Sequence, residues 1–197
     1  MKIAIFGTSN KENEQRVPIY PEHISFLPEK IRSFLCFEKG YGEQFGYSDE
    51  QLGMGVPSFL TRDELFRECN ILILPKPTVA DLNQMSENQV LWGWAHCVQQ
   101  HEIVQSAIDK KVTIVAWEAM HKWHNDHKEF HIFYKNNEIA GYASVIHCLQ
   151  LLGMDGHYGP RRRVILISYG SVSRGAIYAL QGRGFNNLHV FTRRPVH

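Results

Sequence analysis

The stretch from Arg163 to Arg194 constrains the fold of this chain more than any other part of the sequence. It begins with the aliphatic run Arg163-Val-Ile-Leu-Ile, passes through a turn of small residues and continues as an apolar segment to Gly184. A second apolar run, Leu188-His-Val-Phe, follows. Strand, turn, helix and strand in this order predict a βαβ unit, which is the building block of a parallel sheet.

The turn of this unit predicts a phosphate site. It reads Ser168-Tyr-Gly-Ser-Val-Ser-Arg-Gly. A pyrophosphate needs close approach to the backbone, and a helix N-terminus supplies unpaired N–H groups and the positive end of the helix dipole. We therefore expect a phosphate to contact Gly170, Ser171, Val172 and Ser173. Because Ser168 and Ser173 stand where glycines are usual, a plain strand-to-helix turn without a ligand stays the alternative.

The end of the second strand of this unit predicts the kind of dinucleotide. Sites for NAD usually carry an acidic residue there, which binds the ribose 2′-hydroxyl, whereas arginines at this position suit a 2′-phosphate. Here the strand ends in Thr192, Arg193 and Arg194. These residues predict NADPH as the cofactor.

Composition excludes several classes of protein. Lys and Arg total 21 of the 197 residues against 20 for Asp and Glu, which gives a formal charge of +1 and no basic stripe for nucleic acid. No apolar run approaches the roughly 18 residues needed to cross a bilayer, and the chain opens on a strand pattern instead of a signal peptide. The four cysteines have no paired spacing, so we expect reduced thiols, no membrane, and a cytoplasmic protein.

Taken in order, the rest of the chain alternates strand-like and helix-like segments. Short helices are predicted after Pro21 and Ser48, and two longer ones follow, from the Thr61 capping box to Glu68 and over Val98–Lys110. Strands that are apolar throughout and separated by helices indicate an α/β fold with a parallel sheet covered on both faces. The predicted strands are Lys2–Phe6, Ser33–Phe37, Ile71–Leu74, Val90–Trp94 and Val112–Trp117.

Three polar residues directly follow predicted strands. They are Arg16 in the loop after the first strand, Lys76 between two prolines after Ile71–Leu74, and His96 after Val90–Trp94. In parallel sheets ligands gather outside the carboxyl ends of the strands, so we expect these side chains to lie close together. Each one alone is more typical of a solvated loop charge or a satisfied turn residue. Three such positions at one edge favour a binding site.

The segment from His121 to His131 carries four histidines. Their spacing would place several imidazoles near one face of a helix, and such a face can bind zinc. The alternative is a solvated linker without a ligand. No cysteine lies nearby, so we favour the linker and expect no metal.

Several of these motifs together resemble the alanine dehydrogenase and pyridine nucleotide transhydrogenase superfamily, in order and spacing over nearly the whole chain. Within it, the sequence is most similar to the N5-(carboxyethyl)ornithine synthase branch, chiefly through the phosphate turn and Phe191-Thr-Arg-Arg-Pro195. The motifs that carry the wider resemblance are Lys11-Glu-Asn-Glu-Gln-Arg-Val, the Gly40–Gly46 loop, Leu72-Ile-Leu-Pro-Lys-Pro, Trp92-Gly-Trp-Ala-His, and Ile139-Ala-Gly-Tyr-Ala.

The resemblance implies a domain plan and a reaction. Residues 1–135 would form a Rossmann-like substrate domain, and 136–197 an interdomain helix with the first βαβ unit of a dinucleotide-binding Rossmann domain. Arg16 and Lys76 would hold the carboxylate and carbonyl of a 2-oxo acid, and Lys76 and His96 would act in catalysis. Pyruvate or a similar acid would be joined reductively to the side-chain amino group of ornithine or lysine with NADPH. We also expect a homo-oligomer.

Two other functions stay open from the sequence. One is reductive amination with ammonia, as in alanine dehydrogenases. The other is a ligand-binding module that keeps the fold without turnover, an interpretation favoured by the serines of the phosphate turn. Relatives continue through further strands of the cofactor domain after the equivalent of His197. We therefore expect that the chain is a fragment or that another chain completes it.

Overall fold

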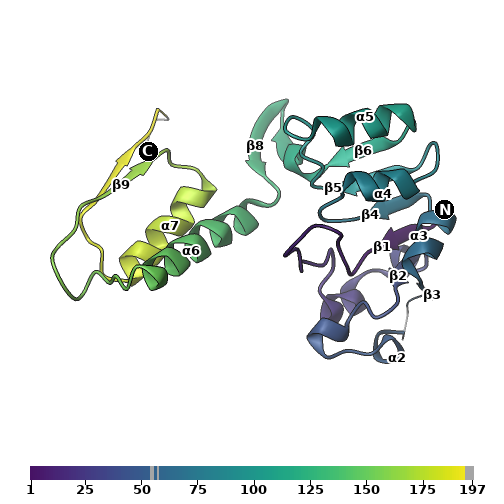
Figure 1. Cartoon of the computed structure of the whole chain (residues 1–197), viewed down its shortest axis with the longest axis horizontal. Helices are drawn as coiled ribbons and strands as arrows, with labels where there is room; N and C mark the ends of the chain where they lie inside the picture. The colour runs from purple at the N-terminus through teal and green to yellow at the C-terminus, as the bar shows by residue number, and fades with distance from the viewer. Residues whose placement is uncertain (54–55, 57, 194–197) are drawn as a thin grey trace. The chain divides into compact units, whose positions relative to one another are not determined.

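The computed structural model describes residues 1–53, 56 and 58–193. They form two compact units, Met1–Ala119 and Met120–His197, which Figure 1 shows in purple to teal and in green to yellow. The predicted domain boundary after residue 135 lies inside the second unit, so the functional division of the chain stays a prediction. Among the described residues, no helix combines the length and the apolarity needed to cross a membrane.

The first unit is built on a parallel sheet of six strands. Its strand order is β3-β2-β1-β4-β5-β6, and every neighbouring pair is parallel. The order reverses between β1 and β4, which is the switch point where doubly wound sheets bind ligands. The α/β parallel fold predicted from the sequence is thus confirmed. The strands are β1 (Ile3–Ile5), β2 (Leu35–Glu38), β3 (Ser58–Leu60), β4 (Ile71–Ile73), β5 (Val90–Gly93) and β6 (Thr113–Ala116).

Both faces of this sheet are covered. Successive strand residues point to opposite faces, so Ala4 and Ile5 are both fully buried but belong to different hydrophobic clusters. Helices α3 (Arg62–Glu68), α4 (Val79–Gln84) and α5 (His101–Asp109) cover the face of Ala4, as Figure 1 shows. The face of Ile5 packs against shorter elements. These are η1 (Pro21–Phe26) and α2 (Asp49–Leu52), with α1 (Glu29–Arg32), η2 (Glu43–Phe45) and η3 (Trp117–Ala119) completing the unit.

The second unit contains the predicted βαβ arrangement. Strands β9 (Val164–Ile167) and β10 (Leu188–Phe191) pair in parallel and are joined by α7 (Ser171–Gly182), which lies beside α6 (Tyr134–Leu151) in Figure 1. One face of β9 packs onto the helices through Leu166. The other face leaves Ile165 60% and Ile167 84% exposed, as expected of a parallel unit with only two strands.

Helices α6 and α7 approach each other very closely at Gly175. A Cβ atom at Gly175 would lie 1.7 Å from the carbonyl oxygen of Glu138 in α6. No real side chain tolerates that distance, so this glycine is required for helix packing and not for the phosphate turn.

The histidine segment is not a helix, so its imidazoles do not lie along one helix face as the less favoured zinc interpretation required. It forms an antiparallel hairpin of β7 (His121–His124) and β8 (His127–His131), in which His121 pairs with His131 and His124 with His127. Asn125 and Asp126 both adopt positive φ. Two successive residues of this kind form the tight turn that closes a two-residue hairpin.

Candidate functional site

The structure brings the three predicted residues of the first unit to one place. Arg16, Lys76 and His96 follow β1, β4 and β5, which are neighbours in the sheet. Nζ of Lys76 is in hydrogen-bond contact with Nε2 of His96. The ring of Trp94 links this pair to Arg16, since its centroid lies 4.6 Å from the Arg16 Cζ and 5.7 Å from the Lys76 Nζ. The roles assigned to these side chains stay predictions.

The backbone of Lys76 is held on both sides, as its sequence context indicates. The flanking residues Pro75 and Pro77 are buried, and Ser9 donates from its hydroxyl to the carbonyl oxygen of Lys76 at 3.1 Å. Helix α4 begins directly afterwards at a capping box formed by Thr78. The Cα atom of Lys76 is therefore held in a fixed position.

His96 occupies a backbone conformation that is uncommon for a residue with a side chain. Its φ is +49°, in the left-handed region, which costs on the order of 1 kcal/mol and persists only where the surroundings enforce it. Its carbonyl oxygen accepts from the N–H groups of Gln99 and Gln100 at 2.9 Å each. This turn delays α5 to His101, three residues after the predicted start at Val98, and aims the imidazole at Lys76.

The environment of this pair favours its uncharged forms. Burial, together with the Arg16 guanidinium, lowers the pKa of Lys76, and the carboxylates of Glu14 and Glu118 oppose that shift. Burial and the neighbouring Lys76 lower the pKa of His96, while Glu118 opposes. A depressed pKa in a basic side chain lowers the pH at which its proton-accepting form becomes available. The pair is therefore suited to moving protons.

Glu14 fixes the guanidinium of Arg16. Its Oε1 accepts from Nε at 2.7 Å and its Oε2 from Nη2 at 2.5 Å, a bidentate contact along one edge of the fork. Arg16 in turn lowers the pKa of Glu14, whose side chain is 8% exposed. Glu14 and Trp94 thus clamp Arg16 from the edge and from the face.

Three further residues of this region were not predicted from the sequence, namely Glu14, Trp94 and Glu118. For Glu14 a signal existed, because a glutamate two residues before an arginine is well spaced to orient it. Trp94 stood inside the quoted motif, but nothing in the sequence distinguished it from a core tryptophan.

A small cavity lies against the Lys76–His96 pair. Its volume is about 210 Å³, and its polar wall includes Lys11 and Gln100, while Val79 and Ile103 form an apolar wall. The lining carries cations and no carboxylate. Such a cavity suits a small anionic molecule.

The second unit contains the predicted phosphate turn at the start of α7. Gly170 is the N-cap residue, and Ser171, Val172 and Ser173 form the first turn, where no described side chain caps the backbone N–H groups. A Cβ atom at Gly170 would meet no atom within 4 Å. The backbone is thus open to close approach by a phosphate, which is the requirement for a dinucleotide.

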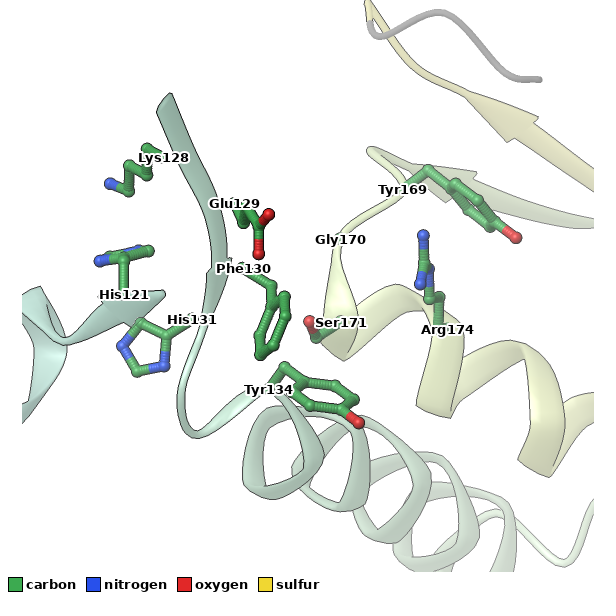
Figure 2. Close-up of a pocket in the computed structure, with 10 residues that line it drawn as sticks. All are labelled: His121, Lys128, Glu129, Phe130, His131, Tyr134, Tyr169, Gly170, Ser171 and Arg174. Carbon is green, nitrogen blue, oxygen red and sulfur yellow. The ribbon is translucent and has the colours of Figure 1, made fainter. Parts of the chain in front are cut away.

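A cavity of about 830 Å³ opens at this turn, and Figure 2 shows the hairpin on its other side. Arg174 lies on α7 with its Cζ 5.2 Å from the Tyr169 ring centroid. Neither Arg174 nor the hairpin residues were predicted to lie at the phosphate turn, because the hairpin itself was not predicted. The lining comprises His121, Lys128, Glu129, Phe130, His131, Tyr134, Tyr169, Gly170, Ser171 and Arg174. Its cationic side chains and its size fit a dinucleotide.

Of the two arginines predicted to bind the ribose 2′-phosphate, Arg193 lies two residues after the end of β10. Because Phe191 pairs with Ile167, Arg193 follows the strand at the same edge as Gly170. Its side chain is exposed and lies outside the lining of the cavity in Figure 2. Arg194 lies outside the described residues.

No metal cluster is formed by the described residues. Nowhere among them do three or more His, Cys, Asp or Glu side chains gather as metal ligands would. The histidines of the hairpin are distributed along both strands, and His121 and His131 form an edge-to-face ring pair with centroids 4.8 Å apart.

Residues 8–140 match the family model described as alanine dehydrogenase/PNT, N-terminal domain. The chain belongs to this family. The match extends from the loop that carries Arg16, through Lys76 and His96, into α6. It therefore includes the whole candidate site of the first unit.

The curated proteins similar to this chain include N(5)-(carboxyethyl)ornithine synthases and alanine dehydrogenases. An N(5)-(carboxyethyl)ornithine synthase of Clostridium botulinum is 28% identical over 208 residues, which cover 98% of this chain and 62% of that protein. The same-named protein of Lactococcus lactis is 26% identical over 100% of this chain and 63% of its own. An alanine dehydrogenase of Lysinibacillus sphaericus is 29% identical over 61% of this chain and 32% of its own length. The chain thus spans less than two thirds of these relatives.

Solved structures support the fold. A transhydrogenase from Sinorhizobium meliloti superposes with a TM-score of 0.74 at 16% identity, covering 99% of this chain and 60% of that one. An L-alanine dehydrogenase superposes with a TM-score of 0.74 at 20% identity, covering 93% and 53%.

Proposed function

We propose that this protein is an NADPH-dependent oxidoreductase that reductively condenses pyruvate, or a similar 2-oxo acid, with the side-chain amino group of ornithine or lysine. The observation that carries the proposal is the convergence of Arg16, Lys76 and His96 around Trp94 at the switch point of the first sheet. Each of the three contributes a different element that imine formation requires.

Arg16 is the group that binds the carboxylate of the oxo acid. Glu14 engages the Nε and Nη2 of Arg16, and Nη1 has no hydrogen-bond partner among the described residues, so it is available to a ligand. A guanidinium held in this way is preorganised for a planar carboxylate. Lys76, when protonated, polarises the carbonyl oxygen of the same acid.

His96 moves the protons of condensation. The amine nitrogen attacks the carbonyl carbon, the resulting carbinolamine takes up a proton on its hydroxyl, and water leaves as the imine forms. His96 has the position and the lowered pKa to accept the proton from nitrogen and return it to oxygen, with Lys76 as its partner. The nicotinamide supplies the hydride that reduces the imine.

The names of the relatives support the amine. Proteins named N(5)-(carboxyethyl)ornithine synthase align with 98% and 100% of this chain, through both units. The alanine dehydrogenase alignment covers 61%. Both groups of names are consistent with a 2-oxo acid site that is shared while the amine substrate differs. Reductive amination with ammonia is therefore the second candidate.

Oxidation of NADPH tests the proposal. The protein at its full natural length is incubated with pyruvate and, separately, ornithine, lysine or ammonia, and absorbance of the reduced nicotinamide is followed. We expect oxidation that depends on ornithine or lysine and that is lost in folded His96→Ala. Oxidation with ammonia alone would assign the protein to the alanine dehydrogenase reaction. A folded protein that is silent with every amine would be a ligand-binding module.

The cofactor preference has its own test. Arg193→Asp places a carboxylate where a 2′-phosphate would lie, so we expect the ratio of the Kd values for NADH and NADPH to fall at least about tenfold. Arg183→Asp is the control, because it makes the same change of charge at the C-terminal end of α7. An unchanged ratio in Arg193→Asp would overturn the NADPH assignment.

A further inference from the structure

A buried cluster of charged side chains lies at the carboxyl edge of the first sheet, outside the site described above. Arg62, the first residue of α3, donates from Nη2 to Oδ1 of Asp81 at 2.7 Å, and its Nη1 lies 3.4 Å from Oε1 of Glu38. Asp81 is fully buried and Glu38 is 6% exposed. Burying charges is costly unless they are paired and hydrogen-bonded in good geometry. Removing any one of these side chains would therefore leave a buried charge without one of its partners.

Glu38 fixes the start of the loop that leads to Arg16. Its Oε2 accepts from the backbone N–H groups of Gly7 and Thr8 at 2.8 Å each. The Thr8 carbonyl oxygen also accepts from Nη1 of Arg62 at 3.2 Å. The chain leaving β1 is thus held by the last residue of β2 and the first residue of α3.

Asp81 ties the same loop to the segment that carries Lys76. Its Oδ1 accepts from the side-chain amide of Asn10 at 2.7 Å, and its Oδ2 accepts from the backbone N–H and hydroxyl of Thr78 at 2.8 and 2.7 Å. Ser9 adds the bond to the Lys76 carbonyl oxygen at 3.1 Å. Two loops that are far apart in sequence are thereby fixed to each other.

Capping of α3 does not require this cluster, although Asp81 also completes the capping box of α4. Helix α3 already begins with a complete capping box, in which Glu64 accepts from the Thr61 backbone N–H at 2.8 Å. The guanidinium of Arg62 instead reaches away from its own helix, over the Phe6 ring with Cζ 4.8 Å from the centroid. Its contacts serve the ends of β1, β2 and β4, not the start of α3.

We infer that Arg62, Glu38 and Asp81 are positioning residues, which hold the Arg16 loop and the Lys76 loop at the separation that the substrate requires. The functional part of this inference rests on the proposed condensation. Misplacement of a catalytic group by about 1 Å is enough to lower turnover about 100-fold. None of the three side chains is required to touch the substrate.

Three variants loosen the cluster to different degrees. Asn10→Ala removes one amide from an exposed residue and leaves every buried charge paired. Asp81→Asn keeps the shape and the acceptor for Thr78 but removes the charge that Arg62 faces. Arg62→Lys keeps the positive charge without the fork. Arg67→Ala is the control, since it lies on the same helix with a side chain 67% exposed.

The first measurement needs no turnover. Acetylation of the Lys76 amine is followed against pH by mass spectrometry of the folded protein, and its midpoint reports the surroundings of Nζ. We expect the midpoint to move up by about half a pH unit or more in the three variants, toward the ordinary lysine value, and to stay in place in Arg67→Ala. A change in overall stability alone would not move it in a folded protein.

The second measurement is steady-state turnover at the full natural length. We expect kcat/KM for pyruvate to fall about 10- to 100-fold in the variants, with the unfolding midpoint of Asn10→Ala unchanged and Arg62→Lys partly active. The inference would be overturned if the variants fold and have the same Lys76 acetylation midpoint and the same kcat/KM as Arg67→Ala. If wild type has no turnover with any amine, the proposed function fails while the Lys76 midpoint still decides the positioning role.

Discussion

Nζ of Lys76 and Nε2 of His96 share a hydrogen bond across the ends of β4 and β5. Two protonated groups would repel each other at this separation, so the contact requires that one of them be uncharged. The two side chains therefore titrate as a coupled pair. In the proposed reaction, a proton would pass between these two side chains.

Lys76→Met should raise the pKa of His96, because burial, Lys76 and Arg16 all lower this pKa and Lys76 ranks directly after burial. Burial remains in the variant, so the value should stay below the ordinary one. The titration of the His96 C2 proton by NMR measures the change, with exposed Lys30→Met as control. A His96 titration that does not move in Lys76→Met would contradict the coupling.

The same shift has a consequence for stability. Because the folded-state pKa of His96 is depressed, the unfolded chain binds more protons between that pKa and the ordinary value of about 6.5. The free energy of unfolding should therefore rise with pH through this window and fall as the pH drops through it. In Lys76→Met, His96 should contribute less to this dependence of the free energy of unfolding on pH. Denaturant unfolding at several pH values measures the difference.

Glu14→Ala should weaken binding of the oxo acid. The variant removes both bonds along the Nε and Nη2 edge of Arg16, which frees the guanidinium to leave the Trp94 face. Charge-assisted bonds of this kind contribute about 1.5 to 3 kcal/mol, so KM for pyruvate should rise at least about tenfold. Exposed Glu12→Ala is the matched control. Equal KM values for the two variants would show that Arg16 holds its position without Glu14.

Gly170→Ala should separate cofactor binding from folding. The added methyl group meets no atom of the described structure within 4 Å, and the backbone at Gly170 is extended, so stability should be kept. The methyl group enters the space that a pyrophosphate needs, and Kd for NADPH, measured by fluorescence, should rise at least about tenfold. Gly182→Ala, at the far end of α7 and equally unobstructed, is the control. If both variants bind NADPH alike, the phosphate lies elsewhere.

Gly175→Ala should instead lower the stability of the protein. Its Cβ would collide with the Glu138 carbonyl oxygen at 1.7 Å, so α6 and α7 must move apart. Overpacking of this kind costs about 1 to 3 kcal/mol or more, whereas Gly182→Ala in the same helix should slightly stabilise the protein. Denaturant unfolding of the two variants gives the comparison. Equal stability would mean that the two helices do not depend on a close contact at Gly175.

The sequence was sufficient for elements with strong local signals. The Thr61 capping box predicted α3 and its end at Glu68, and the apolar run beginning at Ile71 predicted β4. Parallel strands with polar residues at their carboxyl ends also predicted where Arg16, Lys76 and His96 would gather. These predictions needed only the local sequence and the rule that ligands bind at the carboxyl ends of parallel strands.

Other elements depended on contacts that no local pattern carries. Strand β3 reads Ser-Phe-Leu, so it lacks the continuous aliphatic run by which the equally short β1 and β4 were predicted. The hairpin β7–β8 consists mostly of polar residues, with Trp123 and Phe130 as exceptions. Its turn, Asn125-Asp126, identifies it, because the strands show no regular apolar alternation. The Arg62 cluster joins residues from four separate segments, and each of these residues alone is typical of a solvated surface. Only the folded chain shows that they meet.

The ring of Trp94 supports both Arg16 and Lys76, and this constrains how the site can be altered. Any replacement at Trp94 disturbs the two cations together, so neither natural variation nor engineering can retune one of them at this position alone. The apolar wall of the small cavity, formed by Val79 and Ile103, is free of that constraint. Substrate range should therefore diversify through this wall, while the tryptophan stays as it is.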